Sequence, residues 1–167
     1  LHGTVEDYKE IRGVGEVKAI QLACIGELSA RIWKAAVSEK TIVFDAPSKV
    51  AAFYMEEMRH LEQENLKLLL LNTKNILLRD ITVSRGTVNA SCATPREIFI
   101  EALRSRACGI ILLHNHPSGD PTPSREDCLF TERVREAGSL MGIPLLDHIV
   151  IGDNSYVSLR ERGIFET

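Results

Sequence analysis

Two histidines one residue apart carry the clearest chemical signal in the sequence. His114 and His116 stand in the run His114-Asn115-His116-Pro117, directly after an apolar run at residues 107–113. Such a run is typical of a strand buried on both faces. In an extended backbone, side chains two residues apart point to the same side, so both imidazoles can face one metal ion.

The predicted third ligand is Asp127, on a predicted helix that follows the histidines. Its position falls in a series of apolar residues at helical spacing, so its carboxylate is expected on the side of the helix that faces the core. A bare carboxylate there would be costly, and binding a metal removes that cost. Two His, one Asp and an open position for water match a catalytic zinc ion, which lowers the pKa of its water to about 7 and polarises a substrate carbonyl. The series comprises Asp127, Phe130, Val134, Ala137 and Met141.

Other polar residues nearby leave alternatives open. Asp120 is a rival ligand, although Gly119-Asp120-Pro121 is typical of a turn. Asp147 and His148 are neighbours on a predicted strand and therefore point to opposite faces. One of them could support the metal site, although a hydrogen-bonded core residue is the more ordinary role.

Ser124 also has a purely structural interpretation. A Ser three residues before an acid, here Asp127, resembles a capping box at the start of a helix. Such a cap would place the hydroxyl at the helix entry, near the carboxylate, so the structural and the chemical role are compatible. Capping explains Ser124 but does not explain the two histidines.

The elements that position these residues are predicted to form an α/β fold, a mixed sheet with flanking helices. Apolar spacing and capping residues predict helices at 5–11, 16–37, 48–62 (with Ser48 as N-cap), 94–106 (with Pro95 at its first position) and 124–141. Apolar runs between turn residues predict strands at 66–71, 76–78, 107–113, 145–151 and 156–157. The break at 45–48 separates a predicted first unit, residues 1–42, from residues 43–167.

The histidine segment resembles the JAMM motif of the MPN metalloprotease family. That motif has an upstream Glu, then His-x-His-Pro, then a Ser and an Asp, with ten residues between the second His and the Asp. His114, His116, Pro117, Ser124 and Asp127 all match, including the spacing. The resemblance implies the MPN fold, a mixed sheet between helices that is related to the cytidine deaminase architecture, and the predicted order of elements agrees with it.

The longer run 114–124 resembles the RadC-like branch of this family. So do residues 70–75, 95–97 and 146–149, and the match spans roughly residues 46–162. The sequence departs mildly at Tyr156-Val157-Ser158-Leu159, where the usual text is Tyr-Tyr-Ser-Phe. We expect this difference to matter little.

The resemblance also implies a catalytic Glu, which composition does not single out. In the family it stands at the start of a strand just before an apolar run, and Gln63-Glu64-Asn65 fits that description. We assign Glu64, with Glu62 as the obvious register alternative. The competing residues are Glu56, Glu57, Glu62, Glu64, Glu97 and Glu101.

The implied activity is zinc-dependent hydrolysis of a peptide or isopeptide bond in an unidentified protein or peptide. Glu64 would take a proton from the attacking water and later give it to the leaving amine. Ser124 would help to stabilise the oxyanion. Neither the natural substrate nor the oligomeric state is indicated by the sequence.

Other function classes are weighed against the ligand set. A non-catalytic MPN scaffold is disfavoured because scaffold members usually lack one or more ligands, and all are present here. A zinc deaminase is excluded because its His-x-Glu and Pro-Cys-x-x-Cys signature is absent. A DNA-associated, repair-linked protein with an accessory MPN domain is the remaining alternative.

Residues 1–42 resemble the second half of a helix-hairpin-helix module. The turn is Gly13-Val14-Gly15, with Lys18 one helical turn later. Backbone amides at a helix start can bind phosphate, but a Gly-x-Gly turn also joins helices that bind nothing. This segment holds six basic and six acidic residues, so the electrostatic contribution that dominates DNA affinity is weak.

The bulk composition fits one soluble globular domain with a small attached module. Of 167 residues, 44% are hydrophobic and 26% are charged. The net charge of −3 indicates no general basic surface for nucleic acid. No apolar run approaches the ~20 residues of a membrane span and no signal peptide is visible, so no membrane partner is expected.

The cysteines indicate a reducing, cytoplasmic environment. They form no Cys-x-x-Cys pair, so no cysteine-based zinc site is expected. Cys108 and Cys128 are predicted to be small buried thiols. The sequence starts at Leu1 rather than Met, as a fragment would, so the missing signal peptide has little weight. The four cysteines are Cys24, Cys92, Cys108 and Cys128.

Overall fold

The computed structural model describes residues 4–38 (33–38 as backbone only), 43–86 and 94–165, in two compact units, residues 1–42 and 43–167. The first unit contains α1 (Val5–Lys9) and α2 (Glu16–Ser38), joined by a turn in which Gly13 has a φ of +89°. Thr4 starts α1 through a capping box with Asp7. Helix α1 is two residues shorter than predicted.

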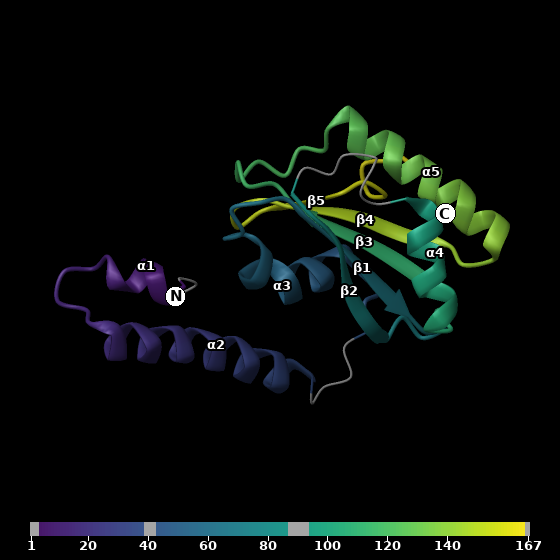
Figure 1. The fold of residues 1–167 in the computed structure, drawn as a ribbon. Coiled ribbons are helices and arrows are strands. Elements are labelled where there is room, and N and C mark those ends of the chain that lie inside the picture. Colours follow the sequence, from purple (N-terminus) through teal and green to yellow (C-terminus); the bar gives the residue numbers. More distant parts are fainter. Residues whose placement is uncertain (1–3, 39–42, 87–93, 166–167) are drawn as a thin grey trace. The chain divides into compact units, whose positions relative to one another are not determined.

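The second unit is built on a five-stranded mixed sheet in the order β2-β1-β3-β4-β5 (Figure 1). Strands β3 and β4 are parallel, and the other neighbouring pairs are antiparallel. This arrangement confirms the predicted α/β class. The strands are β1 (Asn65–Leu71), β2 (Leu77–Arg85), β3 (Gly109–Asn115), β4 (Leu145–Ile151) and β5 (Tyr156–Ser158).

Helices cover both faces of this sheet. Helix α3 (Pro47–Met58) lies on one face, and α4 (Pro95–Arg104) and α5 (Arg125–Met141) lie on the other (Figure 1). The main core fills the space under α4 and α5, because alternate residues of β1 and β3 point there. Burying each large side chain of this kind contributes roughly 1.5–3 kcal/mol. Its members include Leu66, Leu68, Leu70, Ile98, Ile110, Leu112, Phe130 and Val134.

Strand β3 differs from its prediction by two residues at each end. It begins at Gly109 and continues through His114 and Asn115, with every residue buried. The strand extends two residues beyond its predicted end at 113 because His114 pairs with Leu66 in β1 and Asn115 pairs with Ile151 in β4. The prediction of strand structure at residues 107 and 108 was wrong.

The burial predicted for two thiols was also only partly right. Cys108 is exposed and Cys128 is half-buried, while Cys24 is exposed. Cys108 lies just before β3, where its side chain is outside the sheet. Cys92 lies outside the described residues.

Three other boundaries moved for local reasons. Helix α3 begins at Pro47 with Ala46 as its N-cap, so Ser48 is not the cap, and the helix ends at Met58 rather than 62. Proline suits the first helical position because its fixed φ is already helical. Helix α4 ends at Arg104, two residues early, and Arg106 then has a φ of +52°.

Strand β2 extends to Arg85, seven residues beyond its predicted end at 78. The alternation of polar and apolar residues from Asp80 to Ser84 is typical of a half-buried strand and would have identified it.

In α5, the expected cap at Ser124 and the stop at Gly142, with a φ of +67°, are both present. Met141 is exposed, however, so it does not belong to the core-facing side of the helix.

No helix within the described residues combines the length and hydropathy that crossing a membrane requires.

Gly138 in α5 lies closer to neighbouring backbone than a side chain permits. A Cβ at this position would lie 2.6 Å from the Ile143 carbonyl oxygen and 3.2 Å from Phe99 Cζ. The carbonyl belongs to the turn that leads into β4 and cannot move aside alone. We predict that Gly138→Ala lowers the free energy of unfolding by about 1–3 kcal/mol, although Ala is the better helix former by about 1 kcal/mol.

Urea denaturation measures this effect. Ser139→Ala, at the exposed neighbouring position, is the control and should change stability by less than about 0.5 kcal/mol. A Gly138→Ala variant as stable as the wild type would contradict the close packing.

Candidate metal centre

The two histidines are held by the end of β3 and the loop that follows. His114 is completely buried on the same face of the sheet as Leu112. His116 comes one residue after the strand, and its backbone N–H still donates to the Ile151 carbonyl at 2.9 Å. Because of the strand's alternation, the two rings face each other, with their Nε2 atoms 3.0 Å apart.

Asp127 reaches the same place from the first turn of α5. The residue as a whole is 4% exposed, with Oδ1 3.4 Å from His114 Nε2 and Oδ2 3.6 Å from His116 Nε2. Ser124 holds it there: the Ser124 backbone N–H and hydroxyl both donate to Asp127 Oδ2 at 2.7 Å, and Ser124 Oγ accepts from the Asp127 N–H at 3.1 Å. The helix N-terminus favours this negative charge.

The charge state of Asp127 reflects competing effects. Burial alone would raise the pKa of this carboxyl. The hydrogen bond and charge attraction of His114 in its protonated form, with the hydrogen bonds from Ser124, outweigh burial and hold the pKa of Asp127 well below its ordinary value. The site therefore contains a buried anion at neutral pH.

Glu64 approaches from the residue before β1. Its Oε1 lies 3.8 Å from His114 Nε2, and its side chain is 22% exposed. Glu62 is exposed and contributes no atom to this group. The structure thus places Glu64, and not its register alternative, beside the histidines.

Asn115, between the two histidines, fixes the segment that carries Glu64. Its Oδ1 accepts from the Asn65 N–H at 2.8 Å, and its Nδ2 donates to the carbonyls of Gln63 at 3.2 Å and Leu61 at 3.4 Å. These bonds hold the backbone on both sides of Glu64. Asn115 was not singled out from the sequence, although a polar residue in a buried strand is a signal of such a role.

Among the described residues, one group of side chains is suited to a metal ion. The donor atoms of Glu64, His114, His116 and Asp127 all lie within 4.8 Å of one another. Ligand bonds of about 2.0–2.2 Å to a common zinc ion require spacings of this order. Ser124 lies beside the group through its bonds to Asp127.

The loop after His116 orients that ring from behind. His116 Nδ1 lies 2.8 Å from the Asp120 carbonyl oxygen. The Asp120 carboxylate accepts from the Thr122 N–H at 2.9 Å and hydroxyl at 2.7 Å, so Asp120 makes a turn, as its sequence context indicated, and does not join the donor group.

Gly152 allows this loop to pack against the β4–β5 turn. The Asp153 N–H donates to the Gly119 carbonyl at 2.8 Å. A Cβ on Gly152 would lie only 2.3 Å from the Gly119 oxygen and 2.7 Å from Pro121 Cδ. Any larger residue at this position would displace the loop that orients His116.

His148 and Asp147 do point to opposite faces, as their neighbouring positions predicted. His148 is buried with its Nε2 2.8 Å from His114 Nδ1 and its Nδ1 2.6 Å from Thr131 Oγ1. His148 is therefore a buried, hydrogen-bonded core residue, as the more ordinary interpretation predicted, and its contact with His114 also connects it to the donor group. Burial lowers the pKa of His148 well below its ordinary value. Thr131, the other partner of His148, was not identified from the sequence.

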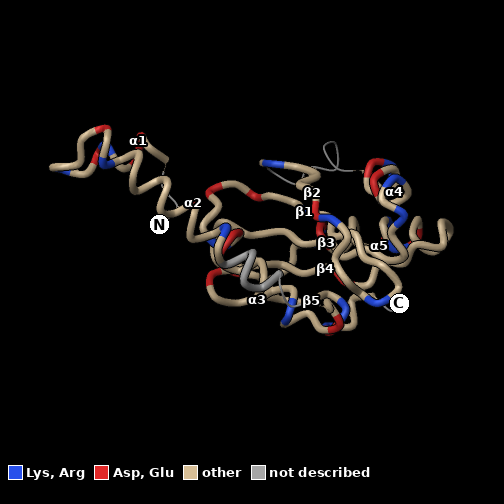
Figure 2. The backbone as a smooth tube through the Cα atoms, turned by 90° about the horizontal axis from the view of Figure 1, so that it is seen from below, with Lys and Arg blue, Asp and Glu red and all other residues tan. Residues whose placement is uncertain are grey.

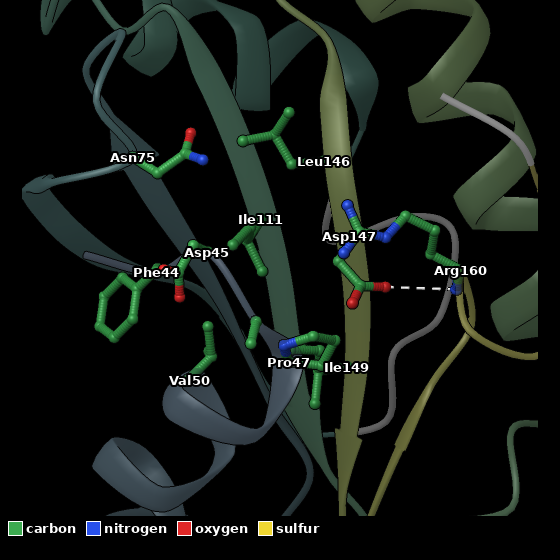
Figure 3. A pocket seen from close by; sticks show the side chains of 11 residues that line it. Phe44, Asp45, Pro47, Val50, Asn75, Ile111, Leu146, Asp147, Ile149 and Arg160 are labelled. Carbon is green, nitrogen blue, oxygen red and sulfur yellow. Dashed lines mark hydrogen bonds between the residues drawn. The ribbon is translucent and has the colours of Figure 1, made fainter. Parts of the chain in front are cut away.

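Asp147 faces a pocket on the α3 side of the sheet (Figure 3). Its carboxylate accepts from the Ser158 hydroxyl at 2.7 Å and from the backbone N–H groups of His148 at 2.7 Å and Arg160 at 3.2 Å. This residue is the hydrogen-bonded core residue that was expected of one of the pair.

We predict that Asn115→Ala destabilises the fold and loosens the segment around Glu64. The substitution leaves the partly buried Asn65 N–H and the Leu61 carbonyl without the Asn115 side chain as partner, which costs about 1–3 kcal/mol. Hydrogen exchange of the Asn65 amide, followed by NMR, should become faster in proportion. Asn65→Ala, which removes only an exposed bond to the Gln63 carbonyl, is the control; equal effects of the two variants would contradict the role of Asn115.

Comparison with known proteins agrees with the resemblance. The model of the RadC-like JAB domain matches residues 44–164. UPF0758 proteins are similar over nearly the whole chain: that of Halalkalibacterium halodurans is 51% identical over 96% of this chain and 68% of its own length. Those of Clostridium botulinum (strain Langeland) and Desulforamulus reducens are each 48% identical over 96% of this chain and 70% of their own length. This chain belongs to the family of proteins with a RadC-like JAB domain.

Proposed function

We propose that this protein is a zinc-dependent hydrolase that cleaves a peptide or isopeptide bond in a protein or peptide substrate. The observation that carries the proposal is the convergence of two imidazoles and two carboxylates from three separate segments, with donor atoms within 4.8 Å. Such a convergence of buried and half-buried polar groups is unfavourable without a cation to neutralise it.

The chemistry of the donor set fits zinc. Nitrogen and carboxylate ligands with one position left open are typical of catalytic zinc sites. His116 Nδ1 faces a carbonyl oxygen, which only accepts, so the ring carries its proton on Nδ1 and its Nε2 is free to bind. His114, His116 and Asp127, the three more buried members, would hold the ion.

When bound, zinc would supply a Lewis acid that activates water near pH 7 and polarises a substrate carbonyl. Glu64 is the group that moves protons. Its side chain is the more exposed of the two carboxylates, at 22% against 5%, so its Oε1 can reach both the donor group and an incoming substrate. There it would accept a proton from the attacking water and return it to the leaving amine.

Ser124 is suited to help the oxyanion, but only after a change of partner. Its single hydroxyl proton is donated to Asp127 Oδ2 in this structure. To donate to a substrate oxygen, the hydroxyl must rotate away from the carboxylate. The Ser124 backbone N–H, also 2.7 Å from Oδ2, would keep Asp127 in place during that rotation.

We predict that the purified chain binds about one zinc ion and that His114→Ala/His116→Ala abolishes this binding. Losing both imidazoles leaves too few ligands for a tetrahedral site. Metal content by mass spectrometry after dialysis against zinc should fall at least tenfold in the double variant. His60→Ala, an exposed histidine outside the group, should bind as the wild type does. Equal zinc in wild type and double variant would contradict the site.

We predict that Glu64→Gln keeps zinc but lowers the hydrolysis rate by about 10²–10⁴-fold, because an amide cannot take the proton. A library of linear and lysine-linked branched peptides in ¹⁸O-labelled water reports each cleavage as label in a new carboxyl group. Glu62→Gln is the matched control and should remain active. A zinc-loaded Glu64→Gln variant with wild-type activity would exclude Glu64 as the base.

The same library tests the reaction class. A zinc-loaded wild type that incorporates no label into any member of the library would count against the peptidase proposal itself.

A DNA-associated role is the second candidate. The observation that favours it is the Gly13 turn between α1 and α2, the geometry expected of a helix-hairpin-helix segment. Acidic and basic residues are interspersed around this turn rather than gathered by sign (Figure 2), so attraction to phosphate is weak. Fluorescence anisotropy with labelled duplex DNA at 50 and 200 mM salt would distinguish specific binding from none.

A further inference from the structure

A chain of hydrogen bonds runs from the back of the His114 ring to the main chain of α5. His114 Nδ1 lies 2.8 Å from His148 Nε2, and His148 Nδ1 lies 2.6 Å from Thr131 Oγ1. Thr131 Oγ1 in turn lies 2.6 Å from the carbonyl oxygen of Asp127. Thr131 is completely buried and His148 is 1% exposed, so water does not compete for these bonds.

The carbonyl at the end of this chain sets the direction of every bond in it. A carbonyl oxygen only accepts, so the single hydroxyl proton of Thr131 points to Asp127. Thr131 Oγ1 can then only accept from His148, which places a proton on His148 Nδ1. His148 is buried with no carboxylate at either ring nitrogen and is therefore neutral. Its Nε2 has no proton and accepts from His114 Nδ1.

We propose that Thr131 and His148 are positioning residues that hold His114 in the Nδ1-protonated tautomer, with the lone pair of its Nε2 directed at the donor group. The inference rests on the proposed metal site for its purpose. The tautomer itself is a property of the protein without metal.

A second carbonyl imposes the same state on the other histidine. The Asp120 oxygen, 2.8 Å from His116 Nδ1, requires a proton there as well. Both Nε2 atoms, 3.0 Å apart, then present lone pairs to each other beside the Asp127 carboxylate. The two Nε2 atoms and the two carboxylate oxygens of Asp127 repel one another at this spacing unless a cation lies between them. The hydrogen bonds to the Nδ1 atoms therefore favour binding of a cation.

Asp127 contributes to this arrangement with two different groups. Its carboxylate faces the Nε2 atoms of both histidines, and its carbonyl ends the chain that orients His114. A shift of the first turn of α5 would therefore change a ligand and the tautomer of another ligand together.

The test is the tautomer of each ring in the full chain, labelled with ¹⁵N and freed of metal. Long-range ¹H–¹⁵N correlation spectra distinguish a protonated Nδ1 from a protonated Nε2. We expect His114, His116 and His148 all to be protonated at Nδ1. A proton on His114 Nε2 in the metal-free wild type would overturn the proposal.

Two substitutions at residue 131 separate the hydroxyl from its packing. Thr131→Val keeps the shape and removes the hydroxyl, so the tautomers of His148 and His114 should become mixed, and zinc affinity should fall about 10–100-fold. Thr131→Ser keeps the hydroxyl and should retain both tautomers and, within about threefold, the affinity. Unchanged tautomers in Thr131→Val would overturn the proposal.

Zinc titration of the same samples keeps the two proposals distinct. A chain with the expected tautomers that binds no zinc would refute the metal site and leave the directed hydrogen bonds standing. A chain that binds zinc while His114 carries its proton on Nε2 in the metal-free state would refute the positioning role alone.

Discussion

Strand β3 pairs with β1 as far as His114 and with β4 as far as Asn115, and the position of the candidate site follows from this pairing. His114 pairs with Leu66 in β1 and with Val150 in β4, and Asn115 pairs with Ile151. A metal site needs its donor atoms held within about 0.5 Å of the positions that binding requires. A strand without free edges and with every residue buried supplies that rigidity, whereas a loop in the same place would not. The neighbouring strands also supply His148 and the segment that carries Glu64.

Both carboxylates of the candidate site are positioned by polar side chains that also stabilise the fold. Ser124 caps α5 and at the same time holds the Asp127 carboxylate. Asn115 satisfies backbone groups on both sides of Glu64. These bonds cost the fold little, because caps and buried polar groups have to be satisfied in any case. Function and stability therefore draw on the same interactions here.

Sequence alone predicted the α/β class and the order of the elements, because apolar periodicity and capping residues such as Thr94 and Ser124 are local signals. It located His114, His116 and Asp127, but the choice of Glu64 over Glu62 needed the family resemblance. The predicted ends of β3 were wrong, since pairing with neighbouring strands, which no local pattern contains, decided them, whereas the missed part of β2 carries a local signal in the alternation from Asp80 to Ser84. Thr131 was missed, and the choice between Asp147 and His148 as support for the site stayed open, because the contacts of Thr131 and His148 join segments far apart in the chain.

Convergence of these donors on one ion can be measured by X-ray absorption at the zinc edge of the zinc-loaded protein. We expect a four-coordinate ion with two imidazole nitrogens at about 2.0–2.1 Å and oxygen ligands at about 2.0–2.2 Å, with no sulfur. A spectrum with sulfur at about 2.3 Å, or with oxygen ligands alone, would show that the ion binds elsewhere and that these four side chains are not its site.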